Sequence, residues 1–148
     1  MSGAAEAGGS AAGVTLPITG GCNCGAVRFE VTQPFEAAMY CHCTRCQRRT
    51  GTAASANART APEAFRLIKG EDRLRSWEPP DGAPKFFCGD CGSAVFSRSS
   101  GSIGVRLGAL DSDPGIRPAY RQYVAYAAAW EPIPEDGLPR YPEARPSS

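Results

Sequence analysis

The sequence has only one histidine, His42, and it has no long uninterrupted run of apolar residues. A membrane-spanning helix needs about 20 such residues, so we do not expect the chain to cross a membrane. A catalytic triad of serine, histidine and aspartate cannot be argued either, because the one histidine lies among cysteines. The formal net charge of +1 argues against nucleic acid and membrane surfaces as partners.

We also expect no signal peptide, because the N-terminal residues have neither a positive start nor a continuous apolar stretch. We therefore expect a cytoplasmic protein. In that reducing compartment, clustered cysteines indicate metal ligands rather than disulfides. The chain has seven cysteines, an odd number that cannot all pair within one molecule.

Composition divides the 148 residues into one domain and two tails. Residues 1–16 are mostly Gly, Ala and Ser, which cannot bury enough surface to become ordered, so we expect a flexible N-terminal tail. A short C-terminal tail is expected over residues 144–148. The stretch between them, residues 17–143, is long enough for one domain with a modest core.

Short segments with alternating apolar and polar residues follow one another between the tails. In the first of them Val27, Phe29 and Val31 fall on one face, which is typical of a half-buried strand. Similar segments, separated by turns, predict strands over residues 65–68, 74–77, 85–87, 94–97, 103–110 and 123–126.

Only residues 44–50, closed by Gly51, are suited to form a helical turn. Many short strands with abundant turns predict a mostly β fold of antiparallel strands. With 17 glycines and 13 prolines, such a core is weak alone, so zinc ions are plausible staples.

All seven cysteines lie in three short clusters, which are the strongest functional signal in the sequence. They are Cys22 and Cys24, then Cys41, Cys43 and Cys46, and finally Cys88 and Cys91. In the last pair two residues separate the cysteines and a glycine follows each, which is the pattern of a zinc knuckle. A redox dithiol has the same spacing, but the residues after Cys91 return to a strand instead of opening a helix.

A closed zinc site needs four ligands, and the knuckle provides two of them. The other two can come from Cys22 and Cys24 or from the central three cysteines. Cys22 and Cys24 are two residues apart, so in an extended segment they lie on the same side and can bind one ion together. Joined to Cys88 and Cys91, they predict a structural site that links the start of the domain to its middle.

The remaining cysteines, Cys41, Cys43 and Cys46, predict a second zinc site with three protein ligands. An open fourth position is typical of a catalytic zinc. His42 is the obvious fourth candidate, yet in an extended segment it projects to the side opposite Cys41 and Cys43. Two alternatives stay open: His42 binds the metal nevertheless, or a residue such as an aspartate closes the site and makes it structural.

At these clusters the sequence resembles the glutathione-dependent formaldehyde-activating enzyme family, also called the CENP-V/GFA domain family. The likeness rests on GGCNCGAVRF at 20–29, CHCTRCQRRTG at 41–51 and FFCGDCGS at 86–93, and it ends near Trp130 and residues 137–139. The resemblance implies an Mss4-like fold with two zinc ions per chain. It also implies that the outer two cysteine pairs hold the structural ion and that the central three cysteines hold the catalytic one.

The chemistry implied by the resemblance is that of a carbon–sulfur lyase or its reverse. The enzyme that names the family joins formaldehyde to the thiol of glutathione and forms S-hydroxymethylglutathione. One position departs from the family pattern, because many members have a histidine where this chain has Arg121. If that histidine shapes the substrate site in the family, the substrate of this chain differs. The resemblance therefore predicts the fold better than it predicts the substrate.

Four arginines, Arg45, Arg48, Arg49 and Arg59, lie near the central cysteines in the sequence. Guanidinium groups bind carboxylates well, so these residues could hold the carboxylates of glutathione. The alternative is a solvated basic turn. We single out Arg48 and Arg49 as the substrate-binding residues.

The sequence therefore predicts a two-zinc enzyme that acts on a small thiol, such as glutathione, and a small aldehyde. Two other hypotheses stay open. One is a non-catalytic, zinc-stabilised binding module, and the other is a zinc or redox sensor that releases metal on mild oxidation. Exposed aromatic residues on the strands are also compatible with a homodimer.

Overall fold

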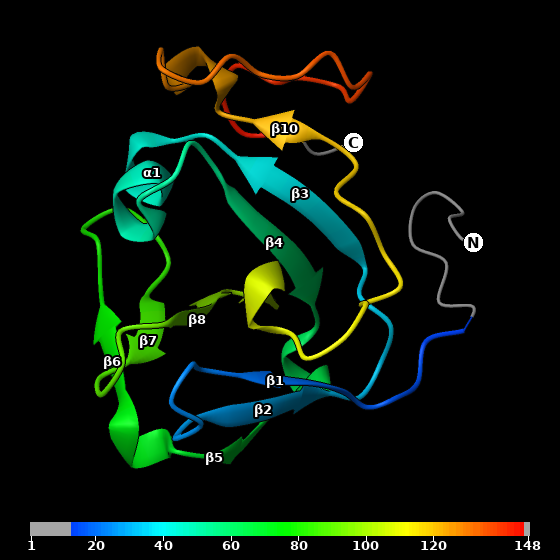
Figure 1. Ribbon diagram of the computed structural model, residues 1–148, viewed down its shortest axis with the longest axis vertical. Helices are drawn as coiled ribbons and strands as arrows, with labels where there is room; N and C mark the ends of the chain where they lie inside the picture. Colours follow the sequence, from blue (N-terminus) through cyan, green and yellow to red (C-terminus); the bar gives the residue numbers. More distant parts are fainter. Residues whose placement is uncertain (1–12, 147–148) are drawn as a thin grey trace.

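The computed structural model describes residues 13–146, which form ten short strands and one short α-helix (Figure 1). The strands are β1 (Ile18–Gly21), β2 (Arg28–Val31), β3 (Ala37–Cys41), β4 (Ser55–Thr60), β5 (Phe65–Lys69), β6 (Leu74–Trp77), β7 (Lys85–Cys88), β8 (Ala94–Ser99), β9 (Ser102–Arg106) and β10 (Arg121–Gln122). The helix is α1 (Thr44–Thr50), and 3₁₀ turns occupy η2 (Pro62–Ala64), η3 (Glu71–Arg73), η4 (Leu107–Ala109) and η5 (Val124–Tyr126).

The two tails expected from composition fall mainly on residues that the structure does not describe. Positions 1–12 of the N-terminal tail and positions 147–148 of the C-terminal tail lie outside the described residues. Within the described part, Val14 packs against the core cluster. Near the other end, Arg145 N donates a hydrogen bond to Gln122 Oε1 at 3.1 Å.

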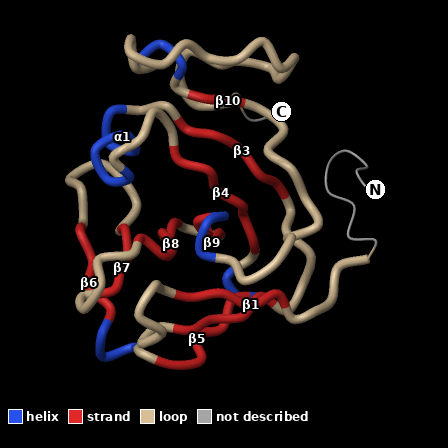
Figure 2. The backbone as a smooth tube through the Cα atoms, viewed as in Figure 1, coloured by secondary structure: helices blue, strands red, loops and turns tan. Residues whose placement is uncertain are grey.

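The strands form two sheets, drawn in red in Figure 2. The smaller sheet has the order β1-β2-β5, and the larger has the order β10-β3-β4-β9-β8-β7-β6. Neighbouring strands are antiparallel except β10 and β3, which run parallel. The prediction of a mostly β fold of short antiparallel strands is confirmed.

One cluster of buried side chains includes residues from both sheets. Val27, Phe29 and Val31 are at most 1% exposed, as their alternation predicts. Phe65 of the small sheet contacts Phe29 beside it and Phe96 of the large sheet, with ring centroids 5.3 and 4.6 Å apart. These aromatic contacts join the two sheets in one core.

Several predicted strands differ from the observed ones. The strands expected between residues 65 and 97 appear as β5 to β8, but the one expected over 103–110 ends at Arg106, where η4 begins. The strand expected over 123–126 is wrong, because Tyr123 has a φ of 59° and this left-handed conformation leads into η5. The alternation pattern also misses β1, β3, β4 and β10.

Helix α1 forms where the sequence predicts it. The Cys43 side chain accepts a hydrogen bond from Cys46 N at 3.3 Å and caps the N-terminus. At the other end Gly51 has a φ of 69° and donates to Gln47 O, which is a left-handed C-cap. The N-cap fixes Cys46 beside Cys43, so the helix itself helps to build a sulfur cluster.

The segment after β10 runs beside that strand, on the side away from β3 (Figure 1). Arg121 N donates to Pro139 O, and Tyr141 N donates to Arg121 O, both at 2.9 Å. β10 is thereby held between β3 and residues 139–141. Residues 13–146 contain no helix with the length and apolar content that a membrane crossing requires.

Candidate functional site

Four of the seven cysteines come together where two hairpins meet. Cys22 and Cys24 lie between β1 and β2, while Cys88 ends β7 and Cys91 lies between β7 and β8. Their sulfur atoms all lie within 4.8 Å of one another, with 3.6 Å from Cys22 to Cys24 and 3.8 Å from Cys24 to Cys88. A tetrahedral zinc with sulfur ligands at about 2.3 Å needs sulfur separations of about 3.8 Å, so this donor set fits the ion.

Hydrogen-bond donors surround these sulfur atoms, as thiolate ligands require. Val27 N donates to Cys22 Sγ at 3.3 Å. Hydrogen bonds from the hydroxyl and backbone of Ser93 lower the pKa of the Cys91 thiol to about 5. Cys22 and Cys24 occupy a turn and not the extended segment that the sequence predicts, and the turn itself brings the two sulfur atoms together.

The four-cysteine cluster connects the two sheets. The β1–β2 hairpin belongs to the small sheet, and the β7–β8 hairpin belongs to the large one. Cys24 and Cys88 are 64 residues apart in the sequence. An ion held by this cluster closes a long loop of the chain, which restricts the unfolded state and stabilises the arrangement of the sheets.

The other three cysteines form a second cluster at the start of α1. Cys41 ends β3, Cys43 caps the helix and Cys46 lies in its first turn, and the three sulfur atoms lie within 4.8 Å of one another. Among residues 13–146 no histidine, aspartate or glutamate joins this cluster, so the protein supplies three ligands. The two clusters together suit two metal ions, and thiolate ligands favour zinc.

A chain of hydrogen bonds leads from Arg106 to the three-cysteine cluster. Arg106 Nη1 donates to Asn57 Oδ1 at 2.6 Å, and Asn57 Nδ2 donates to Ser55 Oγ at 2.9 Å. Cys41 and Cys43, with smaller contributions from Ser55 and the charge of Arg106, lower the pKa of the Cys46 thiol to about 2. The surroundings of Cys46 therefore favour an anionic sulfur atom.

His42 points away from the three-cysteine cluster. Its Nε2 lies 3.1 Å from Arg121 Nη1, and this nitrogen accepts the hydrogen bond because a guanidinium only donates. Burial and the positive charges of Arg121 and Arg140 lower the pKa of His42, which favours the neutral ring. Since alternate residues of an extended segment face opposite sides, this is the orientation that the sequence predicts.

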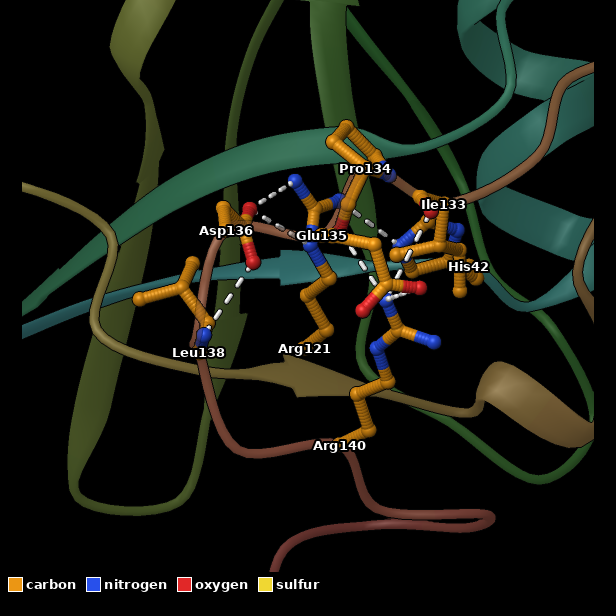
Figure 3. A network of polar contacts seen from close by, with 8 residues as sticks. All are labelled: His42, Arg121, Ile133, Pro134, Glu135, Asp136, Leu138 and Arg140. Carbon is orange, nitrogen blue, oxygen red and sulfur yellow. Dashed lines mark hydrogen bonds and ion pairs between the residues drawn. The ribbon is translucent and has the colours of Figure 1, made fainter.

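Arg121 lies between His42, which follows β3, and the C-terminal segment (Figure 3). Its guanidinium donates to Asp136 Oδ2 at 2.8 Å and lies 4.3 Å from the centre of the Tyr40 ring. The next residue, Gln122, lines the cavity beside the cysteines, because successive strand residues point to opposite faces. The arginine that departs from the family pattern thus supports His42 from the side opposite this cavity.

Replacing Arg121 by alanine should destabilise the fold by about 2 kcal/mol, because the buried acceptor nitrogen of His42 loses its donor. The control is Arg117→Ala, which removes a similar pair with Asp113 whose side chains are 65% and 63% exposed. Urea unfolding followed by tryptophan fluorescence measures both. Equal stability of the two variants would contradict a supporting role for Arg121.

A cavity of about 560 Å³ opens beside the three-cysteine cluster. Cys41 and Cys46 form part of its wall. One face of β4, β8 and β9 contributes five polar residues and a glycine to the lining: Ser55, Asn57, Ser97, Ser99, Ser102 and Gly104. The cluster therefore faces a polar space of the size that binds small substrates.

Cationic side chains also line this cavity. They are Arg49, Arg59, Lys85, Arg106 and Arg145. Of the two arginines singled out for substrate binding, Arg49 reaches the lining, whereas Arg48 is exposed and outside it because adjacent helix residues differ by about 100°. Arg45 instead forms an ion pair with Asp81 at 2.7 Å.

Sequence reasoning misses Lys85, Arg106 and Arg145 as cavity residues. Side chains alternate along β9, so Ser102, Gly104 and Arg106 share a face. This pattern could have identified Arg106 as a cavity residue.

The model of the glutathione-dependent formaldehyde-activating enzyme family matches residues 17–126. Among solved structures, the crystal structure of a Rhodobacter sphaeroides protein is similar, with a TM-score of 0.55 and 25% sequence identity. That likeness covers 83% of this chain and 98% of that chain. No curated protein matches the sequence. The region matched by the family model contains both cysteine clusters and four of the five cavity cations.

Proposed function

Because this chain belongs to the glutathione-dependent formaldehyde-activating enzyme family, whose fold is Mss4-like, we propose that it joins a small thiol to a small aldehyde. The reaction is the reverse of a carbon–sulfur lyase cleavage, and glutathione with formaldehyde is the reference pair. The observation that carries the proposal is the three-cysteine cluster in the wall of a polar cavity of about 560 Å³. We place the reaction in the cytoplasm, where thiols stay reduced.

The proposed reaction balances without an oxidant or a reductant. The thiol sulfur forms a bond to the carbonyl carbon, the carbonyl π bond breaks, and the proton of the thiol ends on the oxygen. A zinc ion held by Cys41, Cys43 and Cys46 supplies an electrophile that lowers the pKa of a thiol and polarises a carbonyl.

The contribution of the chain's own residues is orientation and control of charge. Arg49 and Arg106 line the cavity together with Cys46, so they can hold an anionic group of the thiol substrate. Ser55 lowers the pKa of the Cys46 thiol, which favours the thiolate form that would bind a metal ion. Positioning of the two reactants supplies much of the remaining rate gain.

Exchange NMR spectroscopy with ¹³C-formaldehyde and glutathione tests the proposal, because adduct formation in water can be followed at equilibrium. We expect the zinc-loaded protein to increase the exchange rate in proportion to its concentration. Free zinc at the same concentration is the control. If neither glutathione nor a more acidic or more highly charged thiol exchanges faster with protein than with free zinc, the enzyme hypothesis fails and a binding module is favoured.

A further inference from the structure

The cavity beside the three-cysteine cluster carries more positive charge than the cluster can balance. Five cationic side chains line it, while none of its described lining residues is an aspartate or a glutamate. In the part of the chain that the structure describes, no salt bridge joins any of the five to an acid. Three thiolates with one divalent ion carry a single negative charge, which offsets one of the five cations.

The cations nearest the cluster also act on one another. Burial and then the charge of Arg49 lower the pKa of Arg106 to about 10. Burial and then the charge of Arg106 lower the pKa of Lys85. Cations that are partly removed from water and lack counter-ions are costly to the fold, and a negatively charged ligand removes that cost.

Strand register places two of the cations at the ends of one row across the large sheet. In this row Lys85 lies opposite Ser97, Ser97 lies opposite Gly104, and Gly104 lies opposite Arg59. At about 4.8 Å between strands, the row spans about 14 Å. Gly104 leaves space in the middle of this row. A Cβ there would lie 3.1 Å from Ser97 Oγ and 3.8 Å from Arg106 Nη1.

Arg59, at one end of the row, lies at a distance from the cysteines that only an extended ligand can bridge. Cys41 is opposite Ser55 on β4, and Arg59 is four residues further along the same strand. At about 3.4 Å per residue this is about 13 Å. Arg106 lies between the two ends, opposite Asn57, and among the described residues its Nε and Nη2 have no hydrogen-bond partner.

We propose that this cavity accepts an extended thiol that carries at least two negative groups and no ammonium group. The thiol rests on the proposed function, whereas the charge requirement rests on the cavity alone. Arg59 holds the negative group at the far end, and Arg106 and Lys85 hold the one nearer the sulfur. Glutathione itself is then a poor fit, because the five cations repel its ammonium group and no described lining residue offers a carboxylate that would offset this repulsion.

Two probes with blocked thiols test the charge requirement separately from any reaction. S-methylglutathione has two carboxylates and an ammonium group, and its desamino counterpart has a hydrogen in place of that ammonium group. Isothermal titration calorimetry on the zinc-loaded full chain should show that the desamino probe binds about tenfold more tightly, with an affinity that falls as salt rises. Equal binding of the two probes, or tighter binding of S-methylglutathione, would overturn the proposal.

Substitutions locate the site. Arg59→Gln should weaken binding of the desamino probe about tenfold. Gly104→Ala should also weaken its binding, because the added methyl group takes up space in the cavity and leaves the charge unchanged. The control is Arg66→Gln, since Arg66 is 65% exposed and lies on β5 of the other sheet. A loss as large in Arg66→Gln as in Arg59→Gln would contradict the site. If the probes discriminate but no thiol exchanges with formaldehyde, this inference stands and the proposed reaction fails.

Discussion

The variant Cys88→Ser is expected to lose cooperative folding altogether. Cys88 is 0% exposed, and its sulfur belongs to the cluster that joins the β1–β2 hairpin to the β7–β8 hairpin. Structural zinc sites contribute about 10–16 kcal/mol in small zinc domains, whereas the net stability of a whole domain is only about 5–15 kcal/mol. Serine is a poor ligand at neutral pH, so the loss of this site exceeds what the small core can compensate.

Far-UV circular dichroism during heating, together with zinc analysis of the purified protein, measures this effect. Wild type should contain two zinc ions and unfold in one transition, and Cys88→Ser should show no transition. The control is Cys43→Ser, the same change in the other cluster. A Cys88→Ser protein that melts within a few degrees of wild type would show that the four-cysteine cluster does not hold the sheets together.

The division of the cysteines could be predicted from the sequence because few arrangements satisfy the ligand count. Cys88 and Cys91 supply half of a closed site, and completing it with Cys22 and Cys24 leaves the three neighbouring cysteines together for a second ion. That inference needs no knowledge of the sheets. The turn at Cys22 and Cys24 could not be foreseen, but it does not matter to the result, because a turn and a strand both bring such a pair together.

Strands β3 and β4 could not be predicted, and they form part of the cavity wall. Their sequences, AAMYC and SANART, are rich in alanine, which has little preference for strands. These segments become strands because they pair with each other and with β10 and β9 on either side. Pairing with distant strands therefore decides their structure, and the residues of each segment alone do not reveal it.

The positions of the cavity cations could not be predicted either, because they also depend on how distant strands pair. Arg49 comes from α1, Arg59 from β4 and Arg106 from β9, so no short segment contains them together. Of the two arginines singled out near the central cysteines, Arg49 lines the cavity and Arg48 does not, and substrate binding by either stays a prediction. Adjacent helix residues differ by about 100°, and only the packing of α1 on the sheet determines which of them faces inward.

The variant Cys43→Ser should keep its fold and contain one zinc ion. Its rate in the proposed exchange reaction should be at least about a hundredfold lower than that of wild type. The three-cysteine cluster lies within six residues of sequence and connects only β3 to α1, so its loss does not separate the sheets. Serine also preserves the N-cap of α1, because its hydroxyl accepts the hydrogen bond from Cys46 N that Cys43 now accepts. The activity falls because the site has lost one of its three ligands.

Zinc content, circular dichroism and the ¹³C-formaldehyde exchange rate are measured on the same preparation. Cys43→Ala serves as the comparison, since it removes the ligand and the cap together and should cost about 1 kcal/mol more in stability than Cys43→Ser. Collapse of both variants would mean that the cluster is structural, as a binding module requires. A folded Cys43→Ser protein that still contains two zinc ions and exchanges normally would remove the cluster from the reaction. The two hypotheses therefore differ in whether a single thiol in this cluster serves folding or chemistry.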